Sequence, residues 1–410
     1  MEISLPILIL LLILMVAITI VTLFYKPRKK KLARDRYTLG LDMLVTGKRK
    51  EAYQLFKSII QEDTDNIQAY LKLGQVVREG GNPVHALKIH KSLIIRKNLT
   101  DYEKIELQKN LALDQYSLKN LSEAIAEIKK ILAIEKKNEW ALVQLVKFSR
   151  EMDDWNNAGE YLKQLLKSTG QTDNHKLGLY KLQQGRMALK RNEYKQALTQ
   201  FDEALKLDKV LWEAHFFKGN VHAAESDNAF EQALAFEEKT PQSSKDRKLH
   251  QQAVDEAKDK LSKAISEWSI FAEKDPEHAW LVLSRLSDGL FALERFDEIS
   301  KILQKVLKKD SGNIDALTEL ANYYVQKGDA ANALDLTDQV LEKDDNSLQT
   351  RLIRLKISIQ KKDYRNLIQD VDKLIELVSK NEYGLKHRSE RNTDMKWLFS
   401  SSGDLENFKE

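Results

Sequence analysis

Residues 185–208, GRMALKRNEYKQALTQFDEALKLD, contain the spacing of small and apolar residues on which the fold prediction rests. Gly185 is followed twelve residues later by Ala197, and Phe201 and Ala204 stand four and seven positions beyond that alanine. A small residue where two helices cross lets their backbones approach, and apolar residues at helical spacing fill the seam. The stretch therefore predicts two helices packed against each other as a hairpin.

The same pattern recurs along the chain at a period close to 34 residues, beginning at Gly40 and ending at Leu374. Turn signals separate the paired helices, among them Thr46-Gly47-Lys48. Helix breakers are scarce, with five prolines and 15 glycines in 410 residues. The series resembles the tetratricopeptide repeat, a helix hairpin of about 34 residues. The resemblance implies an all-α fold, a tetratricopeptide-repeat α-solenoid superhelix of about nine units over residues 37–380.

An insertion near residues 225–260 interrupts this series. It is rich in lysine and glutamate, and two interpretations are open: a pair of projecting helices or a mobile loop. We favour helices broken at Pro241, because apolar residues keep helical spacing on both sides of it. Its role is open too, between a solvated structural excursion and a dedicated partner contact.

The first 25 residues predict a single N-terminal transmembrane helix. Ile3 to Tyr25 contains no charge, and 23 helical residues match the hydrocarbon core of a bilayer, roughly 30 Å thick. A cleaved signal peptide is disfavoured, because the positive charge follows the apolar run and no small-residue cleavage site appears.

A basic segment over residues 26–36 follows the predicted membrane helix. By the positive-inside bias it keeps the bulk of the chain on the cytoplasmic side of the membrane. We also expect it to contact anionic headgroups. Its cations are Lys26, Arg28, Lys29, Lys30, Lys31, Arg34 and Arg36.

Composition argues against several functional classes. The net charge of +4 lies mostly in that basic segment, so no nucleic-acid-binding face is indicated. The absence of cysteine removes disulfides, thiolate metal sites and cysteine nucleophiles. The eight histidines form no metal-binding motif, and His90 takes a packing position in its repeat. We therefore expect no enzymatic activity, no cofactor, no metal and no small-molecule substrate.

Particular residues carry a more specific resemblance. Gly40–Phe56, Leu73–Leu93 and the arrangement of a short anchor before the repeats resemble the lipopolysaccharide assembly protein B family. The likeness is specific over roughly residues 1–135 and architectural from there to 380. In that family the chain ends in a rubredoxin-like ribbon whose two C-x-x-C knuckles hold a metal.

The tail, residues 381–410, resembles such a ribbon without its ligands. Leu385, Arg388, Phe399 and Ser402 stand where the family has cysteines, and this set makes no metal site. The resemblance implies a small degenerate ribbon-like tail; the alternative is an unrelated polar segment.

By resemblance, the family implies a single-pass adaptor of the inner (cytoplasmic) membrane, with the bulk of the chain on the cytoplasmic side, that regulates lipopolysaccharide synthesis. It presents a client, the committed deacetylase of lipid A synthesis, to a membrane AAA+ protease. A generic scaffold for envelope assembly is the alternative, and the oligomeric state stays open. Repeat geometry suggests that the first helix of each unit lines a partner groove, with these candidates: Leu41, Leu44, Gln75, Arg78, Arg186, Leu189, Asn322 and Val325.

Overall fold

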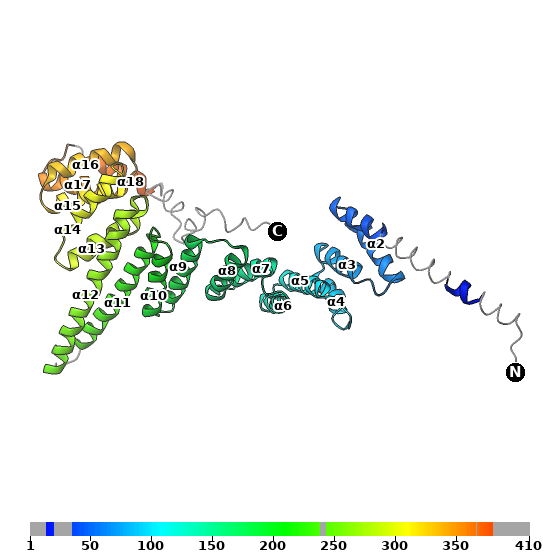
Figure 1. Cartoon of the computed structure of the whole chain (residues 1–410). Coiled ribbons are helices and arrows are strands. Elements are labelled where there is room, and N and C mark those ends of the chain that lie inside the picture. The colour runs from blue at the N-terminus through cyan, green and yellow to red at the C-terminus, as the bar shows by residue number, and fades with distance from the viewer. Residues whose placement is uncertain (1–13, 20–34, 238–242, 366, 380–410) are drawn as a thin grey trace, which may run out of the picture. The chain divides into compact units, whose positions relative to one another are not determined.

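The computed structural model describes residues 14–19, 35–237, 243–365 and 367–379, and these form helices joined by short turns (Figure 1). The all-α tetratricopeptide fold is confirmed there, with no strand among these residues. The chain divides into an N-terminal unit, Met1–Thr172, and a C-terminal unit, Asp173–Glu410.

The N-terminal unit consists of helix pairs. Residues 35–45 are helical and precede the next helix in the first pair. The remaining helices are α2 (Arg49–Glu62), α3 (Ile67–Glu79), α4 (Pro83–Lys91), α5 (Asp101–Ser117), α6 (Leu121–Ile134), α7 (Glu139–Glu151) and α8 (Trp155–Thr169).

The C-terminal unit continues in the same way, except that one pair is much longer. Its elements are α9 (Asn174–Lys190), α10 (Tyr194–Leu207), α11 (Glu213–Glu237), α12 (Ser244–Lys274), the 3₁₀ helix η1 (Pro276–Leu281), α13 (Leu283–Ala292), α14 (Glu298–Lys309), α15 (Ile314–Gln326), α16 (Ala330–Lys343), α17 (Leu348–Lys361) and α18 (Leu367–Ser379). The insertion lies in α11 and α12, which have 25 and 31 residues and run past α9 and α10 in Figure 1.

Helix crossings explain why glycine is required at particular positions. A Cβ atom on Gly40 would lie 2.8 Å from the ring of Phe56, too close for a van der Waals contact. A Cβ atom on Gly185 would lie closer still to the ring of Phe201. These fully buried rings anchor the cores of their hairpins, so the small residue and the large one form a single steric unit.

Polar side chains set the starts of several helices. Asn66 Oδ1 accepts from the backbone N–H of Ala69 at 3.0 Å at the start of α3. Thr100 and Glu103 form a complete capping box before α5. Gly47 and Gly81 adopt positive φ, 75° and 87°, in the turns that join the two helices within each of the first two pairs.

No helix in the described part of the chain is long and apolar enough to cross a membrane. Of the predicted span over residues 1–25, only residues 14–19 are described, and they are helical.

Candidate functional site

The predicted partner residues lie on the first helix of each pair, on what we call the first-helix face. The aliphatic residues among them pack mainly against the hydrophobic core. Leu41, Leu44 and Leu189 are half-buried against the hydrophobic clusters of their units. Val325, also a predicted partner residue, is 2% exposed and packs with Ile353 and Ile357 of α17, because the next helix pair covers that side of α15.

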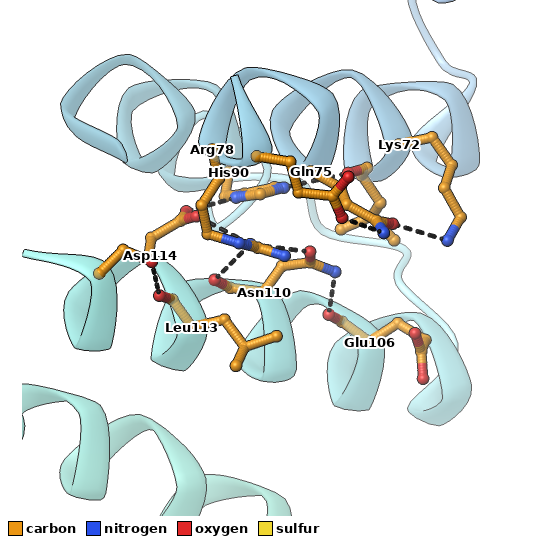
Figure 2. Close-up of polar contacts among 11 residues, drawn as sticks. Lys72, Gln75, Arg78, His90, Glu106, Asn110, Leu113 and Asp114 are labelled. Atoms are coloured by element: carbon orange, nitrogen blue, oxygen red, sulfur yellow. Dashed lines mark hydrogen bonds and ion pairs between the residues drawn. The ribbon is translucent and has the colours of Figure 1, made fainter. Parts of the chain in front are cut away.

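The polar members on α3 are held by neighbouring side chains. Lys72 Nζ donates to Gln75 Oε1 at 2.9 Å, and Gln75 Nε2 donates to Glu79 Oε1 at 2.8 Å. Arg78, one turn beyond Gln75, reaches across to α5, where Nη1 donates to Asn110 Oδ1 at 3.3 Å and to Asp114 Oδ1 at 2.9 Å. Figure 2 shows this polar row between the two helices.

Beneath Arg78 lies a buried charged cluster. Asp114 is fully buried, and its second carboxylate oxygen lies 2.5 Å from Nδ1 of His90, which is also fully buried (Figure 2). Nε2 of His90 lies 3.2 Å from the carbonyl oxygen of Leu71. Arg78, with a side chain 10% exposed, closes the cluster toward the surface. One carboxylate therefore joins α3, α4 and α5.

Each group of this cluster has a hydrogen-bonding partner. The carbonyl oxygen of Leu71 is only an acceptor and lies beside Nε2 of His90. Arg78 is always cationic, and Asp114 lies between its guanidinium and Nδ1 of His90. The arrangement is an imidazole and a guanidinium that share one buried carboxyl group. Such a cluster is stable only while every partner is present.

Asp114 was absent from the sequence prediction, although the sequence carries a signal for it. It stands two residues after the small residue of its helix, where three other repeats place the buried Val76, Phe148 and Val221, and the first repeat has an exposed Asp42. An acid that is buried at this position requires a polar partner. His90, in a position where other repeats have Phe56 or Phe201, supplies one.

Contacts between first helices continue from α5 to α7. Tyr116 stacks on Phe148 with ring centroids 4.5 Å apart, and its hydroxyl donates to Glu151 Oε1 at 2.9 Å. The hydrogen bond and burial together raise the pKa of Tyr116, burial contributing most. Lys147 Nζ lies 5.1 Å from the same ring. The first-helix face of the N-terminal unit is therefore a row of ordered polar and aromatic side chains.

In the C-terminal unit the corresponding positions are engaged differently. Arg186 of α9 lies over the ring of Phe217 at 5.2 Å, and its Nη1 donates to Gln183 Oε1 at 3.0 Å. Asn322 is half-buried on α15. Near it, Glu319 accepts from Gln349 Nε2 of α17 at 2.9 Å. Sequence reasoning missed Glu319, which has no signature beyond helical spacing.

Other predicted residues fall at the margins of the structure. The ribbon positions Leu385, Arg388, Phe399 and Ser402 lie outside the described residues, as do the basic-segment cations from Lys26 to Arg34. The remaining cation, Arg36, makes a two-pronged ion pair with Glu62, whose hydrogen bond raises the pKa of the guanidinium. Arg36 is therefore engaged in an ion pair within the protein.

No group of three or more histidine, aspartate or glutamate side chains suited to a metal ion occurs within residues 14–19, 35–237, 243–365 and 367–379.

Comparison with known proteins adds to this geometry. Two family models described as tetratricopeptide repeat match residues 182–246 and 290–354. The chain carries tetratricopeptide repeats. It is 28% identical over 142 residues to lipopolysaccharide assembly protein B of Escherichia coli strain K12, covering 33% of this chain and 35% of that protein.

The protein of the same name in Haemophilus influenzae is 29% identical over 157 residues, which cover 36% of this chain and 39% of that protein. The chain thus spans little more than a third of the length of the curated relatives it matches.

Solved structures with some likeness include a tetratricopeptide repeat protein from Parabacteroides merdae, 14% identical with a TM-score of 0.24, covering 90% of this chain and 97% of that one. A thermophilic protein of the same class from Thermus thermophilus is 16% identical with a TM-score of 0.28, covering 46% of this chain and 98% of that one.

Proposed function

We propose that this protein is a membrane-anchored adaptor that binds other proteins through its first-helix face and regulates lipopolysaccharide synthesis. In this proposal the face holds a biosynthetic enzyme, and the N-terminal segment holds the scaffold beside a membrane protease. The similarity to lipopolysaccharide assembly protein B supports the pathway. The observation that carries the binding role is the ordered polar row on α3, α5 and α7.

Order in that row favours binding. Lys72, Gln75 and Arg78 are held by neighbours before any partner arrives, so less side-chain entropy is lost on association. Within the described part of the chain, Nε and Nη2 of Arg78 have no acceptor, since each of its hydrogen bonds uses Nη1. A planar guanidinium fixed at one nitrogen suits a partner's carboxylate or carbonyl oxygen at the others.

Tethering strengthens such contacts. Confining scaffold and client to one membrane surface raises their effective concentration, so individually weak contacts become useful. The adaptor therefore needs no deep pocket for its client.

A cross-linked pull-down from membranes tests the proposal. The full chain should recover the deacetylase of lipid A synthesis together with a membrane protease. The double variant Lys72→Glu, Lys109→Glu reverses one charge on α3 and one on α5, where Lys109 pairs with Glu106 at 2.8 Å, and should lose the deacetylase. The matched control Lys129→Glu, Lys130→Glu reverses two exposed charges on α6 and should keep it.

Two results would overturn the proposal in different ways. If neither enzyme is recovered while envelope-assembly proteins are, the protein is a scaffold outside lipid A synthesis. If the α6 variant loses the client and the first-helix variant retains it, the binding face has been misplaced.

A further inference from the structure

The outer surface of α4 differs from those of the other second helices in the N-terminal unit. Between Glu79 and Asp101 the chain contains no acidic residue. The cations in this stretch are Lys88, Lys91, Arg96 and Lys97. The other second helices, α2, α6 and α8, all carry acids: Glu51, Glu62, Glu123, Glu127 and Glu160.

Apolar side chains are exposed among these cations. Ile95 is 84% exposed, and Ile94 and Val84 are 52% and 53% exposed. Val84, Lys88 and Lys91 lie on one face of α4, because they are four and three residues apart. Ile94 and Ile95 follow in the turn that leaves the helix. We call these residues, with Lys97, the α4 surface.

The turn that carries the two isoleucines is well fixed. Leu93 is fully buried among Leu71, Leu107 and Leu111. The N–H groups of Leu93, Ile94 and Arg96 donate to carbonyl oxygens three residues earlier, at 3.0, 3.1 and 3.1 Å. Ile94 and Ile95 are thus presented to the outside by a built turn, although their neighbour is core.

The lysines of the α4 surface differ from Arg96 in their partners. Arg96 pairs with Asp65 at 3.2 Å and lies over the ring of Tyr70 at 4.9 Å. Lys88, Lys91 and Lys97 make no ion pair or hydrogen bond with any residue that the structure describes. Three lysines without an ion partner among the described residues therefore lie on α4 and in the turn that carries the exposed isoleucines.

We propose that the α4 surface rests on an anionic bilayer, with Ile94 and Ile95 entering the headgroup boundary and the three lysines binding lipid phosphates. Aliphatic tips ringed by lysine match the interfacial region in both polarity and charge. The α4 surface offers no aromatic anchor or directional hydrogen-bonding group of the kind that dominates protein interfaces.

This inference rests on the membrane placement in the proposed function and adds a second point of contact. One apolar tip with three lysines binds a bilayer weakly by itself, and stable attachment needs two signals. With the N-terminal segment as the first signal, the α4 surface would fix how the first repeats stand on the membrane.

The absence of cysteine allows a direct test. Ile95→Cys gives the full chain one thiol, which takes an environment-sensitive fluorophore. The labelled protein is reconstituted into nanodiscs of phosphatidylcholine with phosphatidylglycerol, with or without lipids spin-labelled near the headgroup. The matched control is Met152→Cys, an apolar residue 44% exposed in the same unit and flanked by Glu151 and Asp153.

We expect the probe at position 95 to shift its emission to the blue and to be quenched by the spin-labelled lipid, unlike the probe at position 152. Reversing Lys88, Lys91 and Lys97 to glutamate should abolish the quenching. Neutralising a single one of these lysines should lower the affinity of the α4 surface for the bilayer about fivefold. Phosphatidylcholine alone should give weaker quenching.

Failure takes distinguishable forms. If the chain does not co-purify with nanodiscs, the membrane placement of the proposed function is wrong. If it does and position 95 is quenched no more than position 152, the inference about the α4 surface is wrong. If position 95 becomes shielded only when a purified client is added, the α4 surface binds protein.

Discussion

Two helix crossings meet the same steric demand with different chemistry. In α9 and α10, the ring of Phe201 packs against Gly185. This ring is apolar and needs no hydrogen-bonding partner. In α3 and α4, Gly74 receives the imidazole of His90, which also fits but requires partners for both nitrogens. Glycine solves the packing problem in both pairs.

The difference lies in the kind of contact that the next helix pair supplies. Phe201 is stabilised by apolar burial, to which the stacked ring of Phe217 in α11 contributes, with ring centroids 5.6 Å apart. His90 depends instead on a hydrogen bond with Asp114 of α5, which also pairs with Arg78. Both crossings couple adjacent repeats, but the polar one requires particular partner groups, whereas the apolar one requires only side chains of suitable shape.

The largest expected effect comes from removing the shared carboxylate. Asp114→Ala leaves the buried polar groups of His90 and Arg78 without their shared partner and should lower the free energy of unfolding by about 3–5 kcal/mol. Urea unfolding, with hydrogen exchange of peptides from α3 to α5, measures it. The triple variant Arg78→Met, His90→Phe, Asp114→Val should recover most of the loss. A loss below about 1 kcal/mol in the single variant would contradict the cluster.

The reciprocal change places histidine in the apolar crossing. Phe201→His puts a polar ring in a buried site near Val221 and should cost roughly 2–4 kcal/mol. Adding Val221→Asp supplies the missing acid and should restore part of that loss. Hydrogen exchange in α9 and α10 reports both variants. Equal stability of Phe201→His and the wild type would show that the two crossings are interchangeable.

A smaller effect on stability is expected at the starts of α5 and α10, which differ in their capping. Thr100→Ala removes the capping box of α5 and should cost about 1 kcal/mol. Glu193 precedes α10 without a side-chain cap hydrogen bond, so Glu193→Ala should change stability by only a few tenths of a kcal/mol. Thermal unfolding of both variants tests this; a loss for Glu193→Ala as large as that for Thr100→Ala would contradict it.

The smallest effect concerns a partly exposed charged group in the C-terminal unit. Burial raises the pKa of Glu267, but hydrogen bonds from His215 and Lys218 outweigh it, so the pKa lies below the ordinary 4.5. The unfolded state therefore takes up the proton first. The stability contributed by Glu267 is present above pH 4.5 and is lost as the pH falls through the lower folded value.

Urea midpoints of the wild type and Glu267→Gln, measured between about pH 6 and pH 3, test this linkage. The wild type should lose stability more steeply on acidification than the variant. Parallel curves would show that the carboxylate contributes nothing to pH dependence.

Helix pairing was readable from the sequence because its determinants are local. Gly185 and Phe201 are separated by a single hairpin, and the helical repeat fixes which side chains face each other across the turn. The same spacing placed His90 in a packing position, where the structure has it. Asp114 could not be predicted in this way. Helical spacing alone does not show that its side chain is buried against His90, which lies in the preceding helix pair.

The all-α repeat and the steric pairs at its crossings could be read from the sequence alone, since both follow from spacing within about 34 residues. Which side chains face outward became evident only from the packing of one helix pair on the next. Val325 is covered by α17, Arg78 is drawn onto Asp114, and the α4 surface stays open. These outcomes depend on how one hairpin packs on the next, and residues outside the repeat's own period supply those contacts.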